Sequence, residues 1–432
     1  MCQQNPGREE PGSLQDSRAQ SKSPEATISL EPFPWDVGVY DAHCHPTGTM
    51  SSMSSISGMR ARILTVMSTR LQDQDLVAEA ASDQGVNEPQ TPLHSALQDQ
   101  ARIVPSFGWH PWFSYQLYDD LAPNPTYDGT KAGKVAHYDE VLAPSPSTKD
   151  VAFAEGLPDP RPLSKFIEET KARLERYPLS LVGEIGLDKA FRLPQNWTAS
   201  HETQRDQGLT PGGREGRNLS PFRVRITHQA TILHAQLKLA GKMDRAVSVH
   251  GVQVHGILYD TISHCWKGHE KEVLSRRQKR QIAKGAEDFS SDPEEDCEDD
   301  GNVILSEMRI QAKSTKSEGK SSKPFPPRIC LHSYSGHADT IKRYVDPSVP
   351  AQVFFSFSTA VNFGTGGHEK TEDAIREVPD DRILVESDLH TAGQPMDDAL
   401  EDICRRVCGI KGWNLKQGVE KLSRNWEEFA FG

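Results

Sequence analysis

Eight short apolar runs, each followed by polar, Gly or Pro residues, recur along the chain and restrict the folds that it can adopt. They cover residues 37–44, 61–68, 102–109, 179–186, 245–251, 328–334, 352–358 and 382–388. Their length and β-branched content predict strands, and residues 227–243 between two of them have the apolar spacing of a helix. Because strands that alternate with helices form parallel sheets, we expect an α/β fold, a closed (β/α)8 TIM barrel.

Three segments do not fit this alternation. Residues 1–32 are polar and rich in Ser, Gln and Pro, and predict a disordered tail ahead of a barrel domain at residues 33–432. Residues 123–162 are rich in Pro, Ser and charge, and predict a loop insertion between the third and fourth strands. Residues 256–327 hold a basic block, an acidic block and a Lys/Ser linker, which predict a disordered charged insertion. The basic block is either a solvated charge run or a nuclear-localisation signal.

Composition narrows the class of protein. The 432 residues carry a formal net charge of −12, with 25% charged and 35% hydrophobic residues, which is typical of a soluble protein with a disordered part. No run approaches the ~18 apolar residues of a membrane span, and the first residues lack the apolar core of a secretory signal. Seven scattered cysteines without a CxxC pair favour a reducing compartment, cytoplasmic or nuclear. The acidic balance argues against a broad nucleic-acid coat, but not against a local cleft where metal ions meet phosphate.

Residues that bind metals stand at the ends of the predicted strands. His43 and His45 are one residue apart at the end of the first run, so both rings can point to one side of the strand. Four more follow the same pattern on later strands, namely Glu184, His250, His332 and Asp388. Each alone has an ordinary explanation, such as a hydrogen-bonded core histidine or a helix cap. Together they occupy the end where barrel enzymes build active sites, and they are ligands that suit Zn²⁺, Mn²⁺ or Mg²⁺.

Several motifs resemble, in kind and order, those of the TatD-type metal-dependent deoxyribonucleases, a branch of the amidohydrolase-like barrels. They are "YDAHCHPT", "SFGWHPW", "LVGEIGLDKAFR", "QLKLAGKMDRAVSVH", "ICLHSYSG", "ILVESD" and "LSRNWEEFA". They extend over most of residues 37–431 apart from the two insertions. The resemblance implies a (β/α)8 barrel with one or two divalent ions. It also implies cleavage of phosphodiester bonds in DNA, commonly from the 3′ end.

For one ion, the resemblance implies that His43, His45 and Asp388 are among the ligands. Two ions a few ångströms apart clamp a phosphodiester, activate a water molecule and stabilise the leaving oxygen. Asp388 would orient or deprotonate the attacking water, so we expect Asp388 and Glu184 to be the catalytic residues.

For the second ion, the resemblance implies His250 and His332, with Glu184 bridging the two sites. His110, in "GWHPW", matches a family position near the pocket. It would either contact substrate phosphate or order its own loop. Asp188, in "GEIGLD", would either hold a ligand histidine or cap a helix.

The sequence departs from the family pattern where substrate should lie. Gly251 and Val252 replace a basic residue, and "LHTAGQ" follows Asp388 in place of small residues and Pro. The substrate is therefore expected to be DNA or another phosphodiester. The extra segments are similar to those of a fungal branch described as interacting with a subunit of the anaphase-promoting complex, which implies a protein partner.

Two other functions remain open. The chain is alternatively an interaction protein that keeps the barrel and works through its insertions. It is also alternatively another amidohydrolase, although Glu184 stands where many of those enzymes carry a carbamylated Lys. That position disfavours the second alternative.

Overall fold

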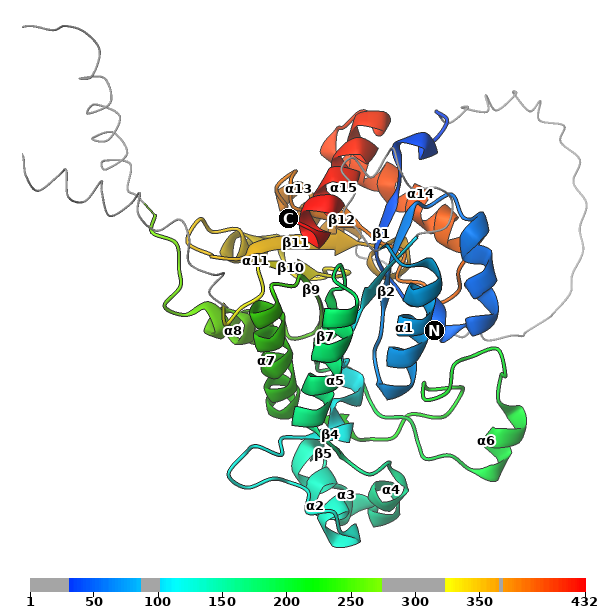
Figure 1. Cartoon of the computed structure of the whole chain (residues 1–432), viewed down its shortest axis with the longest axis vertical. Helices are drawn as coiled ribbons and strands as arrows, with labels where there is room; N and C mark the ends of the chain where they lie inside the picture. The colour runs from blue at the N-terminus through cyan, green and yellow to red at the C-terminus, as the bar shows by residue number, and fades with distance from the viewer. Residues whose placement is uncertain (1–30, 87–101, 274–322, 365–367) are drawn as a thin grey trace, which may run out of the picture. The chain divides into compact units, whose positions relative to one another are not determined.

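The computed structural model describes residues 31–86, 102–273, 323–364 and 368–432. All of its strands and helices belong to the unit Pro34–Gly432 (Figure 1). The tail expected at residues 1–32 lies outside the described residues except for its last two positions. Its disorder stays a prediction.

Eight parallel strands form the centre of this unit, as the sequence predicts. They are β1 (Tyr40–Cys44), β2 (Ile63–Met67), β3 (Ile103–Ser106), β7 (Val182–Asp188), β9 (Val247–Val252), β10 (Arg328–Leu331), β11 (Gln352–Phe357) and β12 (Ile383–Val385). The first three pair in chain order, and so do the last five. A parallel bridge between Ser106 and Leu181 joins the two groups. The Asp388 N–H donates to the His43 carbonyl oxygen at 3.0 Å, which joins the exit of β12 to β1 and closes the TIM barrel.

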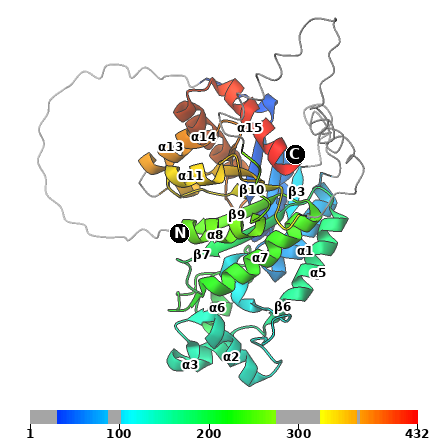
Figure 2. The same cartoon turned by 90° about the vertical axis from the view of Figure 1, so that its left-hand side faces the viewer.

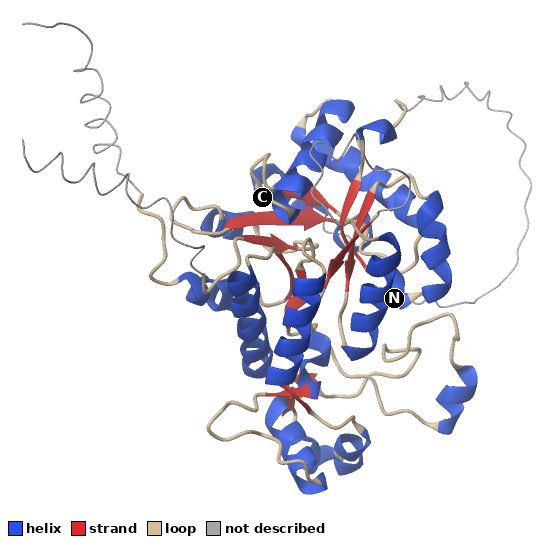
Figure 3. Ribbon diagram, viewed as in Figure 1, coloured by secondary structure: helices blue, strands red, loops and turns tan. Residues whose placement is uncertain are grey.

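Helices follow the strands and flank the barrel (Figure 3). They are α1 (Leu71–Gln84), α5 (Leu163–Arg176), α7 (Ile226–Met243), α8 (His255–Trp266), α11 (Ala338–Tyr344), α12 (Thr359–Asn362), α13 (His368–Glu377), α14 (Gln394–Lys411) and α15 (Leu415–Ala430). Shorter 3-10 turns are η1 (Trp35–Val37), η2 (Pro46–Gly48), η3 (Met50–Gly58) and η4 (Pro111–Gln116). The helix expected at residues 227–243 is confirmed within α7. None of the described helices has the length and apolar character needed to span a membrane.

Residues 123–162 are not the loop that their composition predicts. They contain α2 (Lys131–Val141), α3 (Pro146–Lys149), α4 (Val151–Gly156) and short strands β5 (Leu142–Ala143) and β6 (Arg161–Pro162). Strand β4 (Leu117–Tyr118) comes just before them, and α6 (Ala199–Gln204) and β8 (Arg223–Val224) lie in the segment before α7. Tyr138 and Phe153 of these helices are buried in one core with Phe166 and Phe222. Figures 1 and 2 place α2 and α3 at the end of this unit away from α13–α15.

The residues that suggested a loop in this segment are instead the starts of helices. The Thr130 hydroxyl accepts a hydrogen bond from the Gly133 N–H at 2.9 Å, and the Asp150 carboxylate accepts one from the Phe153 N–H at 3.1 Å. Pro146 is the first residue of α3, where its missing N–H costs nothing. Pro, Ser, Thr and Asp favour turns and helix N-termini alike, so composition alone did not separate the two.

The charged insertion expected at residues 256–327 begins later than predicted. Helix α8 covers its first residues, and Leu258 and Ile262 lie buried on one face of that helix. These two apolar residues are four positions apart, which is the spacing of a helix face, but the charged residues that follow drew attention away from this pattern in the sequence. The basic and acidic blocks fall within residues 274–322, outside the described residues, so the disorder expected there stays a prediction.

An apolar core fills the end of the barrel opposite to the carboxyl ends of its strands. It takes side chains from early positions of the strands, including Tyr40, Ile63, Val104, Leu181, Ala246, Cys330, Phe354 and Leu384. Trp426 and Phe429 of α15 pack into the same core, and the Trp426 indole N–H donates to Thr65 Oγ1 at 3.1 Å. Helix α15 thus covers this end of the barrel.

Replacing Trp426 with alanine should lower the free energy of unfolding by about 3 kcal/mol, because a buried indole is lost and a cavity remains. Urea denaturation followed by circular dichroism measures the change. The control is Leu121→Ala, whose side chain is 80% exposed and should leave stability within about 0.5 kcal/mol. Equal stability of both variants would show that α15 does not support the barrel.

Candidate metal centre

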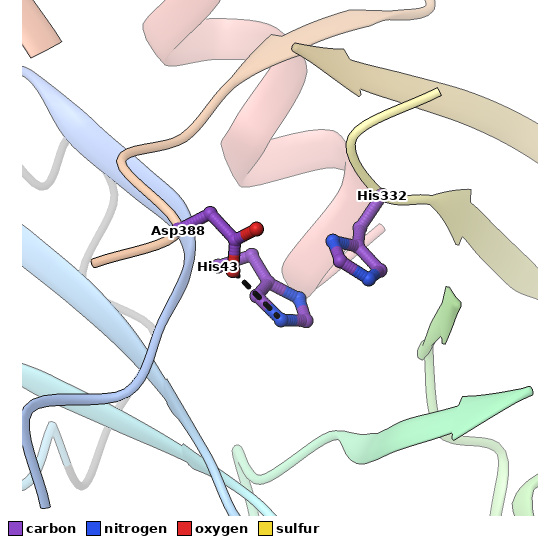
Figure 4. Close-up of side chains that lie close together, drawn as sticks. All are labelled: His43, His332 and Asp388. Atoms are coloured by element: carbon purple, nitrogen blue, oxygen red, sulfur yellow. Dashed lines mark ion pairs between the residues drawn. The ribbon is translucent and has the colours of Figure 1, made fainter. Parts of the chain in front are cut away.

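The six ligand residues expected from the sequence lie together at the carboxyl end of the barrel. Strands β1, β7 and β9 carry His43, Glu184 and His250. The residues that follow strands β1, β10 and β12 are His45, His332 and Asp388. Since the strands are parallel, their ends meet at one mouth. Figure 4 shows His43, His332 and Asp388 turned toward one another from three separate segments.

The Glu184 carboxylate is the centre of this cluster. Its Oε1 lies 2.8 Å from His332 Nε2, 2.9 Å from His250 Nδ1 and 3.0 Å from His110 Nε2. Its Oε2 lies 3.2 Å from His45 Nε2 and 3.4 Å from His43 Nε2. Each oxygen therefore faces a separate set of ring nitrogens, as a carboxylate that bridges two ions must.

Burial makes this arrangement costly unless positive charge is present. Glu184 is only 3% exposed, and an unpaired buried carboxylate is strongly disfavoured. Burial alone would raise the pKa of Glu184, but the neighbouring His110, His332 and His43 outweigh it and hold the pKa well below its usual value. The carboxylate is thus ionised and available as a ligand.

Spacing of the donor atoms tests whether an ion fits. Tetrahedral bonds of about 2.1 Å separate ligand atoms by about 3.4 Å. Around Oε2, His43 and His45 have their Nε2 atoms 3.1 Å apart, and Asp388 Oδ1 lies 3.6 Å from His45 Nε2 and 4.0 Å from His43 Nε2. Three groups have ligand atoms within 4.8 Å of one another: His43, His45 and Glu184; His110, Glu184 and His250; His43, His332 and Asp388. Two groups share Glu184, and the donor set is consistent with a binuclear metal site.

Neighbouring side chains fix the rings of two histidines. Ser248 Oγ lies 2.8 Å from His43 Nδ1, which leaves Nε2 facing Glu184. Asp188 Oδ2 lies 3.1 Å from His250 Nε2, which leaves Nδ1 facing Glu184. Such partners set the tautomer and orientation of a ligand histidine.

Of the two roles expected for Asp188, the structure shows the contact with His250, whereas no helix begins in residues 189–198 for it to cap. Besides His250, its Oδ2 accepts a hydrogen bond from the Trp112 indole N–H at 2.6 Å. Its Oδ1 accepts from the backbone N–H groups of Ala190 and Phe191 at 2.7 and 2.8 Å. Burial would raise the pKa of Asp188, but these bonds and the His250 charge lower it to about 2. The partner Trp112 was not identified from the sequence.

His110 lies inside the cluster rather than at its edge. Its Nε2 faces Glu184, and its Nδ1 accepts a hydrogen bond from the Trp112 backbone N–H at 3.1 Å. Burial lowers the pKa of His110 to about 4, so the ring is neutral. Because Nδ1 accepts a hydrogen bond, Nε2 carries the ring hydrogen and donates it to Glu184 Oε1 at 3.0 Å. The loop contact expected from the sequence is present, and the structure adds a contact with Glu184 that the sequence did not predict.

Asp388 is the more open carboxylate of the cluster. Its side chain is 18% exposed and its backbone has a φ of 53°, a left-handed conformation that costs a non-glycine residue about 1 kcal/mol. Burial raises the pKa of Asp388 to about 6, with the nearby Glu386 adding to the effect and His332 opposing it. A carboxylate with this pKa can accept a proton near neutral pH.

Asp41 joins the two chain segments that carry His43 and Asp388. Its carboxylate accepts hydrogen bonds from the His43 N–H at 3.0 Å, and from the Ser387 N–H at 3.0 Å and hydroxyl at 2.5 Å. Asp41 was not identified from the sequence. The available signal was a buried acid on the same strand face as His43 and His45.

Comparison with known proteins agrees with this geometry. Residues 40–430 match the family model described as TatD related DNase. The chain belongs to the TatD-related DNase family. This confirms the family resemblance inferred from the motifs.

Two curated proteins are similar over most of the chain. Cut9-interacting protein scn1 of Schizosaccharomyces pombe is 33% identical over 90% of this chain and 98% of its own length. An uncharacterized deoxyribonuclease of Saccharomyces cerevisiae, YMR262W, is 25% identical over 81% of this chain and 82% of its own. Among solved structures, the TatD homologue YJJV of Escherichia coli K12 covers 90% of this chain and 95% of its own, with 15% identity and a TM-score of 0.44.

Glu184→Ala should weaken Mn²⁺ binding by about 100-fold, because both groups of histidines lose their shared carboxylate. Isothermal titration of chelator-treated protein with Mn²⁺ measures the change. Glu169→Ala is the control, since that carboxylate pairs with Arg161 and does not contact the cluster. Wild-type affinity in the Glu184 variant would show that the cluster does not hold the ion.

Proposed function

We propose that this chain is a metal-dependent phosphodiesterase, a deoxyribonuclease that removes nucleotides from the 3′ end of DNA. The observation that carries the proposal is the Glu184 carboxylate, whose two oxygens face separate sets of ring nitrogens at the mouth of a TatD-related barrel. Membership of the TatD-related DNase family supports DNA as the substrate.

His43, His45 and Asp388 would hold one ion, and Glu184 would be shared with the second. The second would be held by His250 and His332, while the His110 ring donates to Glu184 Oε1 and orients that carboxylate. When bound, two divalent ions supply positive charge for the phosphodiester and lower the pKa of a water molecule.

The protein groups around these ligands position them and move the proton. Ser248 and Asp188 hold the rings of His43 and His250 so that one nitrogen of each faces Glu184. Asp388, the more exposed carboxylate, would orient the attacking water and accept its proton at Oδ.

Asp388→Ala should lower the rate of nucleotide release from 3′-labelled single-stranded DNA at least about 100-fold, because the proton acceptor is lost. Gel electrophoresis of the products, with Mg²⁺ or Mn²⁺ present, measures the rate. Asp339→Ala, a change in a side chain that is 90% exposed, is the matched control and should keep full activity. Wild-type protein stripped of metal by a chelator should be inactive until metal is restored.

Two results would count against this function. Cleavage that survives in the Asp388 variant would remove the assigned site. No cleavage of DNA by the wild-type protein would leave a different phosphodiester as substrate, or the second function below.

We also propose that the chain binds a protein partner through its charged insertion. The supporting observation is the similarity to Cut9-interacting protein scn1, which extends over 90% of this chain. A protein related to Cut9 is therefore the partner to test.

The described cysteines, Cys44, Cys265, Cys330, Cys404 and Cys408, are buried free thiols, which supports a cytoplasmic or nuclear location.

Deleting residues 274–322 should abolish capture of a Cut9-related partner and leave DNA hydrolysis within about twofold of wild type. The reason is that these residues contain the basic and acidic blocks, whereas the metal cluster lies elsewhere. Co-purification measures the first effect, and the 3′-label assay measures the second. Partner capture by the deleted chain would place the interface on the barrel.

A further inference from the structure

A cavity of about 410 Å³ lies beside the metal centre, and none of the proposed ligands lines it. Its walls come from η4, the end of the helical insertion after α4, and the segment between β7 and β8. The side chains that decide its character are Trp112, Tyr115, Phe191, Trp197 and Arg217. This volume is in the range of about 300–1,000 Å³ that ligand sites occupy.

One side chain connects this cavity to the ligand cluster. Trp112 lines the cavity, and its indole N–H donates to Asp188, which in turn contacts His250. The Trp112 ring centroid lies 4.6 Å from that of His110 and 6.0 Å from that of His250. A molecule that fills the cavity is therefore separated from the ligand rings by a single indole.

Aromatic rings dominate the cavity and reach its opening. Trp112 and Phe191 are stacked, with ring centroids 4.6 Å apart and planes 10° apart. Trp112 and Trp197 are 37% and 39% exposed, although indoles are usually well covered in a folded protein. Large exposed rings beside a reaction site indicate a surface for a flat ligand.

Positive charge accompanies these rings. The Arg217 guanidinium lies 4.7 Å from the Trp197 ring centroid and is held by the carbonyl oxygens of Gln195, Gly213 and Arg214. The carboxylate nearest in sequence, Glu215, pairs with Arg205 at 2.8 Å and also attracts the Arg217 guanidinium. Lys189 and Arg192, on either side of Phe191, are exposed. The surroundings of the cavity therefore favour an anionic ligand in a chain that is acidic overall.

We propose that this cavity receives an unpaired base of a nucleic-acid strand, next to the phosphodiester at the metal centre. The inference rests on the proposed function and adds a choice of substrate to it. The base would stack on the Trp112–Phe191 pair and against Trp197, while exposed cations contact the strand's phosphates. Because a base in a duplex is already stacked between its neighbours, the site selects single strands or frayed ends.

Binding of a 5′-fluorescein-labelled ten-residue oligothymidine, followed by anisotropy with Mn²⁺, tests the proposal. An Asp388→Ala background lets the strand bind without being cut. Adding Trp197→Ala should raise Kd about tenfold, since stacking on an aromatic ring is lost. Trp197→Phe should restore most of the affinity, and Phe191→Leu should weaken binding although the side chain stays apolar. Leu121→Ala, a change of an exposed apolar residue that does not line the cavity, should bind as the background does.

A second strand with abasic residues at its three 3′ positions identifies the base as the ligand. The abasic strand should bind the Asp388→Ala protein about tenfold less tightly, and the added Trp197→Ala change should weaken it little further. Equal affinity of the background and Trp197→Ala proteins for the normal strand overturns the proposal, and so does a background protein that binds neither strand. DNA hydrolysis by the wild type is scored separately, so failure of the nuclease function is distinguished from failure of the base site.

Discussion

The buried Glu184 carboxylate is the interaction on which the arrangement of this protein's centre depends. A charge that is nearly excluded from water requires positive charge close to it, and the chain supplies five ring nitrogens from four segments around that one group. The rings are themselves fixed by Ser248 and Asp188, so the donor atoms are oriented before any ion arrives. Preorganisation of this kind lets a metal site act without rearranging the protein.

The barrel makes this convergence available to residues that are far apart in sequence. Parallel strands expose all their carboxyl ends at one mouth, while α15 and the apolar core occupy the other end. The insertion helices share an apolar core with Trp109, and Gly156 at the end of α4 forms part of the wall of the aromatic cavity. Trp112 is shared between the ligand cluster and this cavity, whereas Trp197 and Arg217 come from a segment that carries none of the proposed ligands. That segment can change, and substrate choice with it, while the proposed ligands stay constant.

The sequence predicted the strands and the polar side chains near their ends, because the spacing of apolar residues, the length of each apolar run and the position at its end are local properties. His43, Glu184, His250 and Asp388 could be placed in this way. Trp112 and Ser248 could not, since an indole or a hydroxyl has many ordinary uses and only the folded chain brings each to a particular ring. Composition also failed in residues 123–162, where residues that cap helices were interpreted as a loop.

The hydrogen bonds of Asp41 have a consequence for the order in which the protein matures. They connect β1 to the segment after β12, with Asp41 and Ser387 separated by 346 positions in the chain. The proposed ligands on either side of this connection, His43 and Asp388, therefore approach each other only after the chain has been synthesised past residue 388 and the barrel has closed. A nascent or truncated chain has half of a site and no means of completing it. An ion that needs both residues, as we propose, would bind only a barrel whose first and last strands have joined.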